Sequence, residues 1–145
     1  MSLEFVFCTR FYEISAVDIT LHILRKECII MILVGIDIGK NQHTFSIIDK
    51  NTGEILSNPS FFPNNREGFL FLIKKLNTYS KSDLLIGMED TGHYHFALLK
   101  HLLDSRYTVA LINPTTTDLT RKLQGGITKN DSLDSLTICD VIGSN

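Results

Sequence analysis

The apolar stretch at residues 32–40 reads Ile32-Leu33-Val34-Gly35-Ile36-Asp37-Ile38-Gly39-Lys40 and carries a single carboxylate, Asp37. The stretch is too short to span a membrane, and its branched side chains favour a buried central strand over a helix. A carboxylate inside such a run is paired, protonated or bound to a metal. Alternatively, Asp37 ends the strand by bonding backbone amides in the turn at Gly39. These residues alone leave both interpretations of Asp37 open.

The length and composition of the chain indicate one globular domain. The 145 residues are 43% hydrophobic and 21% charged, which is typical of a soluble protein with a real core. The net charge of −2 excludes a global basic field, so a nucleic acid would have to meet a local patch. Cys8, Cys28 and Cys139 are far apart and predict neither a zinc site nor a disulfide framework. We therefore expect a cytoplasmic protein.

Residues 1–30 are interpreted as an N-terminal extension, and residues 31–145 as one folded domain. Glu4, Arg10 and other charged residues interrupt the apolar segment of the extension, which argues against a signal peptide. Apolar residues recur at helical spacing between Glu13 and Ile30, so this part is either one amphipathic helix or poorly ordered. Met31, directly before the central strand, is a candidate natural start.

The residues after Asp37 predict a hairpin followed by a helix. His43–Asp49 and Glu54–Phe62 alternate as strands around a turn closed by Gly53. Asn64 and Glu67 have the spacing of a capping box, and the helix that follows should end near Tyr79. Its expected apolar face consists of Phe69, Leu70, Leu72, Ile73 and Leu76.

The second half of the chain predicts alternating strands and helices. The expected elements are a strand at Asp83–Met88, a helix at Tyr94–Leu103 with Phe96, Leu99 and Leu103 inward, a strand at Tyr107–Ile112, a weak helix opened by Asn113-Pro114, a mobile loop at Gln124-Gly125-Gly126, and a last helix from Asp131. Strand–helix–strand order implies parallel pairing. The last helix has little more than three turns before the sequence stops, which suggests a truncated helix.

The order βββαβαβα is that of an α/β, ribonuclease-H-like fold. This fold has a five-stranded mixed sheet, in the order 3-2-1-4-5, flanked by helices. Its first and fourth strands are parallel neighbours, so Asp37 and Glu89 should lie side by side at one end of the sheet. Side chains alternate along a strand, so Gly35 shares a face with Asp37, and Gly87 shares one with Glu89. A helix could therefore pack closely beneath both carboxylates.

Two further acids open the last predicted helix. Asp131 and Asp134 are three residues apart, which places their Cβ atoms roughly 5–6 Å apart on one helix face. Four converging carboxylates would repel each other unless a cation such as Mg²⁺ or Mn²⁺ neutralised them. Two such ions could act on a phosphodiester. The alternative is that Asp131 caps the helix and Asp134 interacts with its dipole.

Three blocks of the sequence carry a family resemblance. Val34-Gly35-Ile36-Asp37-Ile38-Gly39-Lys40, Met88-Glu89-Asp90-Thr91-Gly92-His93-Tyr94 and Lys129-Asn130-Asp131-Ser132-Leu133-Asp134-Ser135 resemble, in order and spacing, the signatures of DEDD transposases of the insertion-sequence 110 family. The resemblance covers about Met31 to Ile142. It implies a RuvC-like domain in which Asp37, Glu89, Asp131 and Asp134 bind the catalytic metal ion, Mg²⁺ or Mn²⁺.

The resemblance also implies partners and a missing part. The expected partners are DNA (the element ends and the target), a guide RNA encoded by the element and, in the full-length protein, further copies of the chain; no membrane is expected. The family has a C-terminal domain with a nucleophilic serine, which is not present in this sequence. The last family block usually reads K-T-D-x-x-D-A, whereas Asn130 and Ser135 replace the threonine and the alanine here. Both departures retain the carboxylates but are also compatible with a decayed copy.

Other residues near the blocks have weaker signals. Lys40, Arg121, Lys122 and Lys129 are candidates to counter phosphate charge, or are ordinary surface charges. Tyr94 is a candidate to orient Glu89 or to meet a nucleic-acid backbone, or is a packed aromatic residue. His93 and His95 form an H-x-H pair that suggests zinc weakly, because no further Cys or His completes a tetrahedral set. Asp90 is expected to be solvated.

Two other functions compete with a metal-dependent DNA transferase. Sugar kinases and actin-like ATPases also begin with a strand bearing G-I-D-x-G, but nothing resembling their second phosphate loop, D-x-G-x-T, follows Lys40. The third interpretation is a non-catalytic transposase remnant that serves dimerisation or RNA binding. Loss of metal affinity would favour the remnant.

Overall fold

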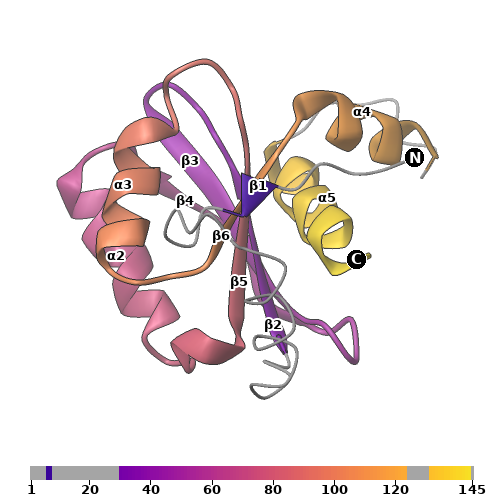
Figure 1. Ribbon diagram of the computed structural model, residues 1–145, viewed down its shortest axis with the longest axis horizontal. Coiled ribbons are helices and arrows are strands. Elements are labelled where there is room, and N and C mark those ends of the chain that lie inside the picture. Colours follow the sequence, from indigo (N-terminus) through magenta and orange to yellow (C-terminus); the bar gives the residue numbers. More distant parts are fainter. Residues whose placement is uncertain (1–5, 8–29, 124–130, 145) are drawn as a thin grey trace, which may run out of the picture.

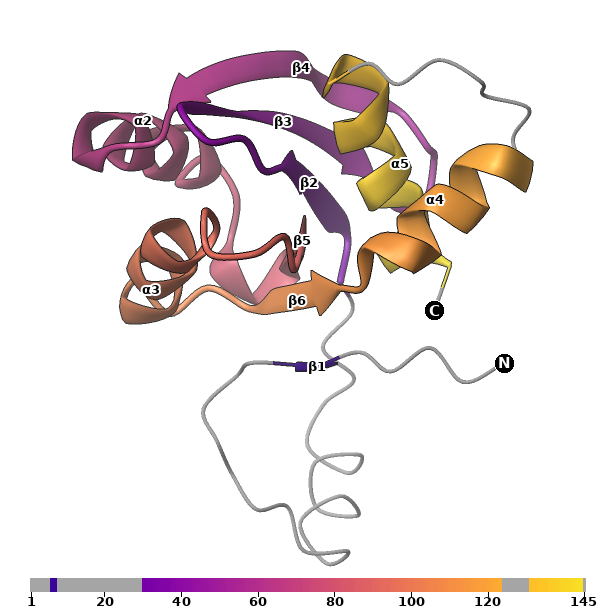
Figure 2. The same ribbon diagram turned by 90° about the horizontal axis from the view of Figure 1, so that it is seen from above.

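The chain folds as three layers, with a mixed sheet between two layers of helices (Figure 1). The computed structural model describes residues 6–7, 30–123 and 131–144. The strands are β1 (Val6–Phe7), β2 (Ile32–Asp37), β3 (Gln42–Asp49), β4 (Ile55–Pro63), β5 (Leu84–Glu89) and β6 (Val109–Ile112). The helices are α2 (Arg66–Leu76), the 3₁₀ turn η1 (Lys81–Asp83), α3 (Phe96–Asp104), α4 (Pro114–Leu123) and α5 (Asp131–Gly143). Helices α2 and α3 cover one face of the sheet, and α5, with α4 beside it, covers the other (Figure 2).

The sheet has the strand order β1-β6-β5-β2-β3-β4. Strands β2, β3 and β4 form the antiparallel meander, and β2, β5 and β6 pair in parallel. The predicted five-stranded order 3-2-1-4-5 is therefore confirmed. The two-residue strand β1 pairs antiparallel with β6 and extends the sheet at that edge. Residues 13–29, expected to be part of an amphipathic helix or poorly ordered, and the predicted loop at residues 124–126 lie outside the described residues.

The central strand β2 is buried on both faces, as its unbroken apolar sequence predicts. Val34 and Ile36 belong to the apolar cluster beneath α2 and α3, whereas Leu33 belongs to the cluster beneath α5. Because side chains alternate along a strand, Gly35 and Asp37 also face α5. The central position of β2 thus places Asp37 between two neighbouring strands, at the end of the sheet.

The cap of α2 differs by one residue from the predicted capping box. The N-cap is Asn65, whose Oδ1 accepts a hydrogen bond from the Gly68 backbone N–H at 2.9 Å. Asn64 instead donates from Nδ2 to the backbone carbonyl of Lys40 at 3.0 Å. The two adjacent asparagines have the same capping chemistry, so the spacing to Glu67 selected the wrong one. Asn64 therefore ties the start of α2 to the turn that follows Asp37.

Two apolar residues and one helix end were predicted wrongly. Helix α2 ends at Leu76 rather than near Tyr79. The side chains of Leu70 and Phe96 are 50% and 58% exposed, although both were expected to point inward. Each lies on the opposite side of its helix from the buried positions, which are Phe69, Leu72 and Leu76 in α2 and Leu98, Leu99 and Leu102 in α3. In the described part of the chain, no helix has the length and apolarity needed to cross a membrane.

Candidate active site

The first two predicted acids end neighbouring parallel strands. Asp37 is the last residue of β2 and Glu89 the last residue of β5, and the parallel register of these strands pairs the residues just before them, Ile36 and Met88. Both acids are half-buried. Because strand side chains alternate, both acids share the α5 face with the glycines two residues earlier, Gly35 and Gly87. The predicted side-by-side arrangement of the two strand ends is therefore present.

Helix α5 packs directly on these glycines. A Cβ atom on Gly35 would overlap the backbone carbonyl oxygen of Ser135, and a Cβ atom on Gly87 would come within 2.7 Å of a side-chain methyl carbon of Ile142. Real Cβ atoms do not make contacts this short. The missing side chains thus allow the helix to approach the strand backbone. This is the close packing that the two glycines predict.

A buried polar contact fixes α5 on the sheet. The hydroxyl groups of Ser46 and Ser135 are hydrogen-bonded at 2.6 Å. Ser46 lies opposite Gly35 in the β2–β3 register, so this bond and the glycine contact hold the same turn of α5. Asp134 precedes Ser135 and is only 3% exposed. The packing of α5 therefore carries a buried carboxylate to the end of the sheet where Asp37 and Glu89 lie.

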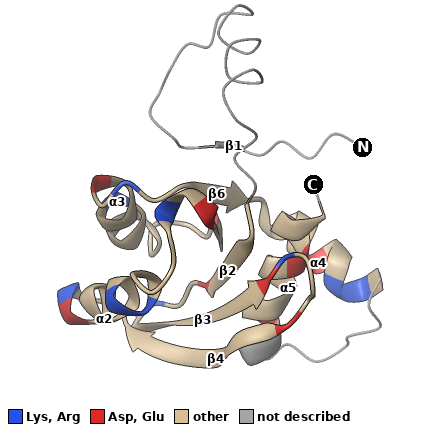
Figure 3. Cartoon of the chain, turned by 90° about the horizontal axis from the view of Figure 1, so that it is seen from below, with Lys and Arg blue, Asp and Glu red and all other residues tan. Residues whose placement is uncertain are grey.

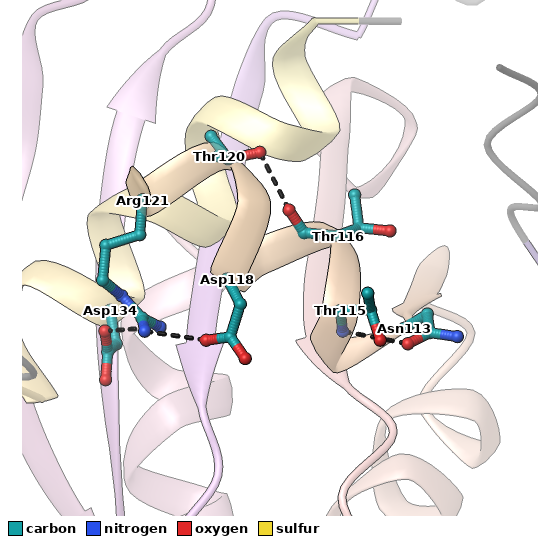
Figure 4. A network of polar contacts seen from close by, with 7 residues as sticks. All are labelled: Asn113, Thr115, Thr116, Asp118, Thr120, Arg121 and Asp134. Atoms are coloured by element: carbon teal, nitrogen blue, oxygen red, sulfur yellow. Dashed lines mark hydrogen bonds and ion pairs between the residues drawn. The ribbon is translucent and has the colours of Figure 1, made fainter. Parts of the chain in front are cut away.

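The guanidinium group of Arg121 joins α4 to this carboxylate (Figure 4). Its Nη2 lies 3.0 Å from Asp134 Oδ1, and its Nη1 lies 2.8 Å from Asp118 Oδ1. The Arg121 side chain is 16% exposed and that of Asp118 is 56% exposed. One cation thus bridges a buried carboxylate on α5 and a solvated carboxylate on its own helix.

The pKa of Glu89 is raised above its ordinary value. Burial is the largest cause, because it disfavours the charged form. The carboxylates of Asp134 and Asp118 act in the same direction, whereas Thr117 and Arg121 oppose them. The effect of Asp134 on the pKa of Glu89 indicates that the helix acid lies near the strand acid.

The structure places three of the four predicted metal ligands at one end of the sheet. These are Asp37, Glu89 and Asp134; Asp131 is the first residue of α5, and its side chain lies outside the described residues. Among the side chains that are described, no three His, Cys, Asp or Glu residues lie close enough together to hold a metal ion. The chemistry of the donor set nevertheless suits Mg²⁺ or Mn²⁺, because carboxylates that are buried or half-buried are hard oxygen ligands and positive charge stabilises their charged forms.

The structure describes four of the five predicted nucleic-acid residues. Lys40 is exposed just beyond β2, and the exposed Tyr94 contacts His93 with ring centroids 4.4 Å apart and ring planes tilted by 43°. Arg121 and Lys122 lie in the last turn of α4, which carries acidic and basic residues beside α5 (Figure 3). Lys129 lies outside the described residues. Of these residues, Arg121 is engaged with carboxylates of the chain itself.

The two histidines near Glu89 have different surroundings. His95 is buried, with Nε2 3.4 Å from Oδ1 of Asp90, whereas His93 is exposed. Asp90 is exposed, as expected of a solvated neighbour of Glu89. The H-x-H pair therefore does not present both rings to a common point at the surface.

Sequence reasoning missed the contribution of α4. Thr117 is fully buried in the site, and Asp118 supplies the second carboxylate of Arg121. The threonine-rich start of α4 predicts only a weak helix, which gave no reason to place these side chains at the site. The spacing of Asp118 and Arg121, three residues apart, was the signal that could have identified their ion pair.

Comparisons with known proteins agree with this fold. Residues 34–144 match the family model of the DEDD transposases of insertion-sequence 110 type, described as "Transposase". The pilin gene-inverting proteins of Moraxella lacunata and Moraxella bovis are each 30% identical to the chain over 107 residues, which cover 72% of this chain and 32% of theirs. The chain thus spans about a third of the length of these relatives.

Solved structures of Thermus thermophilus RuvC have the same fold. RuvC in complex with a Holliday junction substrate aligns with a TM-score of 0.56 at 12% identity and covers 77% of this chain and 91% of its own. A second RuvC structure aligns with a TM-score of 0.52 at 13% identity, covering 77% and 92%. The fold is therefore that of a RuvC-like, ribonuclease-H-type domain. The family match goes further, and the chain belongs to the DEDD transposases of the insertion-sequence 110 family.

Proposed function

We propose that this chain is the metal-binding part of a DNA transposase. In this proposal Asp37, Glu89, Asp131 and Asp134 hold Mg²⁺ or Mn²⁺ for DNA strand cleavage and transfer during transposition of an insertion element. The observation that carries the proposal is the burial of Asp134 on a helix that packs against Gly35, at the end of the sheet where Asp37 and Glu89 lie. A purely structural helix cap would not need a buried carboxylate there.

The electrostatics of the site support a divalent cation. Asp134 raises the pKa of Glu89, so the two acids destabilise each other's charged forms. A bound divalent ion would remove this penalty, and would supply Lewis-acid activation of a water or hydroxyl and stabilisation of the leaving oxygen at a phosphodiester. The residues of the chain would hold the ion at the carboxyl end of β2 and β5 and exclude water on the side covered by α5.

The proposed nucleic-acid contacts come from residues around this end. Lys40 and Lys122 are exposed cations that would meet phosphate groups, and Tyr94 offers an exposed ring to a backbone or base. Lys129 is proposed for the same role on the resemblance alone. A chain with a net charge of −2 would bind DNA through this local set, and its binding would weaken as salt is added.

The remaining partners are proposed from the family alone. They are the element ends and target DNA, a guide RNA encoded by the element, and further copies of the full-length protein in the cytoplasm. The resemblance assigns the nucleophilic serine of the family to a C-terminal domain. The acids described here can therefore be tested by metal binding first and by DNA binding second.

Calorimetric titration of Mn²⁺ tests the proposal. We expect the wild-type chain to bind in the micromolar to low-millimolar range, and Asp37→Asn and Asp134→Asn each to weaken binding at least about tenfold, because each removes a ligand charge. Asp140→Asn is the matched control, since it removes an exposed carboxylate from the same helix α5 and should leave the affinity unchanged.

Two results would contradict the proposal. If Mn²⁺ binds equally well to both ligand variants, the acids do not form the site. If the wild-type chain does not bind Mn²⁺, either alone or with a DNA duplex present, the non-catalytic remnant is the better interpretation.

A further inference from the structure

The side chain of Arg121 makes an ion pair outside its own helix. It could pair with Asp118 alone, since the two residues are three apart on α4 and such pairs are common on exposed helices. Its guanidinium instead reaches a second element and contacts the buried carboxylate of Asp134 on α5 at 3.0 Å. The contacts use different nitrogen atoms, Nη2 toward Asp134 and Nη1 toward Asp118. Either contact can therefore be lost while the other remains.

The two partners of Arg121 differ in burial. The Asp134 side chain is 4% exposed, so its charge is costly without a cation beside it. The Asp118 side chain is 56% exposed, so water solvates it whether or not Arg121 is near. The structural need for the guanidinium thus comes from Asp134, and Asp118 offers a second place for the positive charge.

We propose that Arg121 is a positioning residue that serves as the built-in counter-ion of Asp134 and gives up this carboxylate to a divalent cation. This inference rests on the proposed function of Asp134 as a metal ligand. A cation that binds Oδ1 of Asp134 competes with Nη2 of Arg121 for the same oxygen. The guanidinium group brings a positive charge to the site, and Arg121 retains Asp118 as its partner after the exchange. No charge is left buried and unpaired at any stage.

The exchange also involves Glu89. The charges of Asp134 and Asp118 raise the pKa of the Glu89 carboxyl group, and the charge of Arg121 lowers it. Arg121 therefore balances three carboxylates from three elements: β5, α4 and α5. A divalent cation carries more charge than the guanidinium and can replace it in this balance. Replacement of Arg121 by a neutral residue should thus destabilise the metal-free protein. It should also increase the affinity of the carboxylates for the cation.

A metal titration measures the competition. We expect Arg121→Gln to bind Mn²⁺ about tenfold more tightly than wild type, because the competitor for Asp134 is gone. Arg121→Lys retains the charge and should return the affinity toward the wild-type value. Asp118→Asn removes the alternative partner of Arg121 and should weaken binding severalfold. Lys74→Gln on the opposite face is the matched control for loss of one positive charge, and it should not change the affinity.

A urea denaturation series measures the counter-ion role without any metal. Arg121→Gln and Asp134→Asn should each lower the unfolding midpoint, and the double variant should lose less than the sum of the two, because the pair is already broken by either change. Additive losses would show that the two residues do not stabilise each other, and would overturn the proposal. Arg121→Lys covers the case in which Arg121→Gln does not fold.

The results separate this inference from the proposed function. Equal Mn²⁺ affinity of wild type and Asp134→Asn, or no binding by wild type, overturns both. If Asp134→Asn loses binding but Arg121→Gln binds no more tightly than wild type, only the exchange is overturned. A merely structural Arg121 would weaken metal binding when replaced, so the sign of the change distinguishes the two roles.

Discussion

The two faces of the sheet are built in different ways. Beneath α2 and α3, large apolar side chains such as Phe45, Phe62 and Leu72 fill the space between sheet and helices. Beneath α5, the strands present glycine and serine, and the helix carries a buried carboxylate. The first face gains stability from the apolar area removed from water. On the second face, helix α5 lies closer to the strand backbone and more polar groups are buried. This packing positions Asp134.

The difference shows how a small domain combines stability with a charged site. A buried acid costs free energy unless it is paired, and here the pairing comes from Arg121 on a neighbouring helix. We expect changes on the apolar face to lower stability without moving the acids. Changes on the α5 face should also move Asp134, because the contacts that hold this helix set the position of its carboxylate.

The largest effects should come from one substitution on each face. Gly35→Ala forces the backbone of α5 away from β2, and Leu72→Ala leaves a cavity beneath α2; each should cost ~3 kcal/mol of unfolding free energy, measured by urea denaturation. At a temperature where both variants are folded, only Gly35→Ala should weaken Mn²⁺ binding. Equal loss of affinity in both variants would show that the two faces are not functionally distinct.

A smaller effect is expected at the serine pair. Ser135→Ala leaves the buried hydroxyl of Ser46 without this partner and should cost ~1 kcal/mol. The double variant Ser46→Ala/Ser135→Ala removes both hydroxyls and should regain most of that loss. Urea denaturation of the four chains measures this coupling. If the double variant is less stable than either single variant, the hydrogen bond is not what joins α5 to β3.

The smallest effect should be a pH dependence from the apolar face. Burial lowers the pKa of His43 from its ordinary value of 6.5, and its Nδ1 accepts a hydrogen bond from the Gly39 N–H at 3.2 Å, which requires the neutral ring. Below pH 6.5 the unfolded chain binds this proton more readily than the folded chain. The unfolding free energy should therefore fall as the pH is lowered from 6.5 toward the depressed pKa.

Denaturation at several pH values tests this prediction. His43→Gln should show a shallower loss of stability below pH 6.5 than wild type, whereas His93→Gln, at an exposed position, should follow the wild-type curve. Identical slopes for wild type and His43→Gln would mean that His43 does not contribute to the acid sensitivity of the domain.

Much of the fold could be predicted because its signals are local. The apolar run ending at Asp37, the turn at Gly53 and the proline that opens α4 each predict an element from a few neighbouring residues, and their order predicts the sheet. The errors at Asn64, Leu70 and Phe96 have the same origin. Short-range spacing locates a helix well but fixes its start and its buried side only within a residue or two.

Some residues of the candidate site could be predicted from the sequence, and others could not. The acids Asp37, Glu89 and Asp134 stand out in the sequence because all three lie in the family blocks, and because Asp37 lies late in a predicted strand and Glu89 directly follows another. The role of α4 does not stand out. Thr117 and Asp118 look like ordinary residues of a weak helix, and only the packing of α4 on α5 brings them to the site.

The order of the elements, the central strand and the glycines that admit a close helix can be predicted from the sequence, because periodicity and the absence of a side chain act locally. The contacts of Arg121 with Asp134 and of Ser46 with Ser135 cannot be predicted in this way and are seen in the folded chain alone. These pairs join residues of different elements, and their contacts depend on how the helices α4 and α5 dock. Ion pairs and hydrogen bonds between residues far apart in the sequence depend on how the elements pack. No single stretch of the chain encodes that packing.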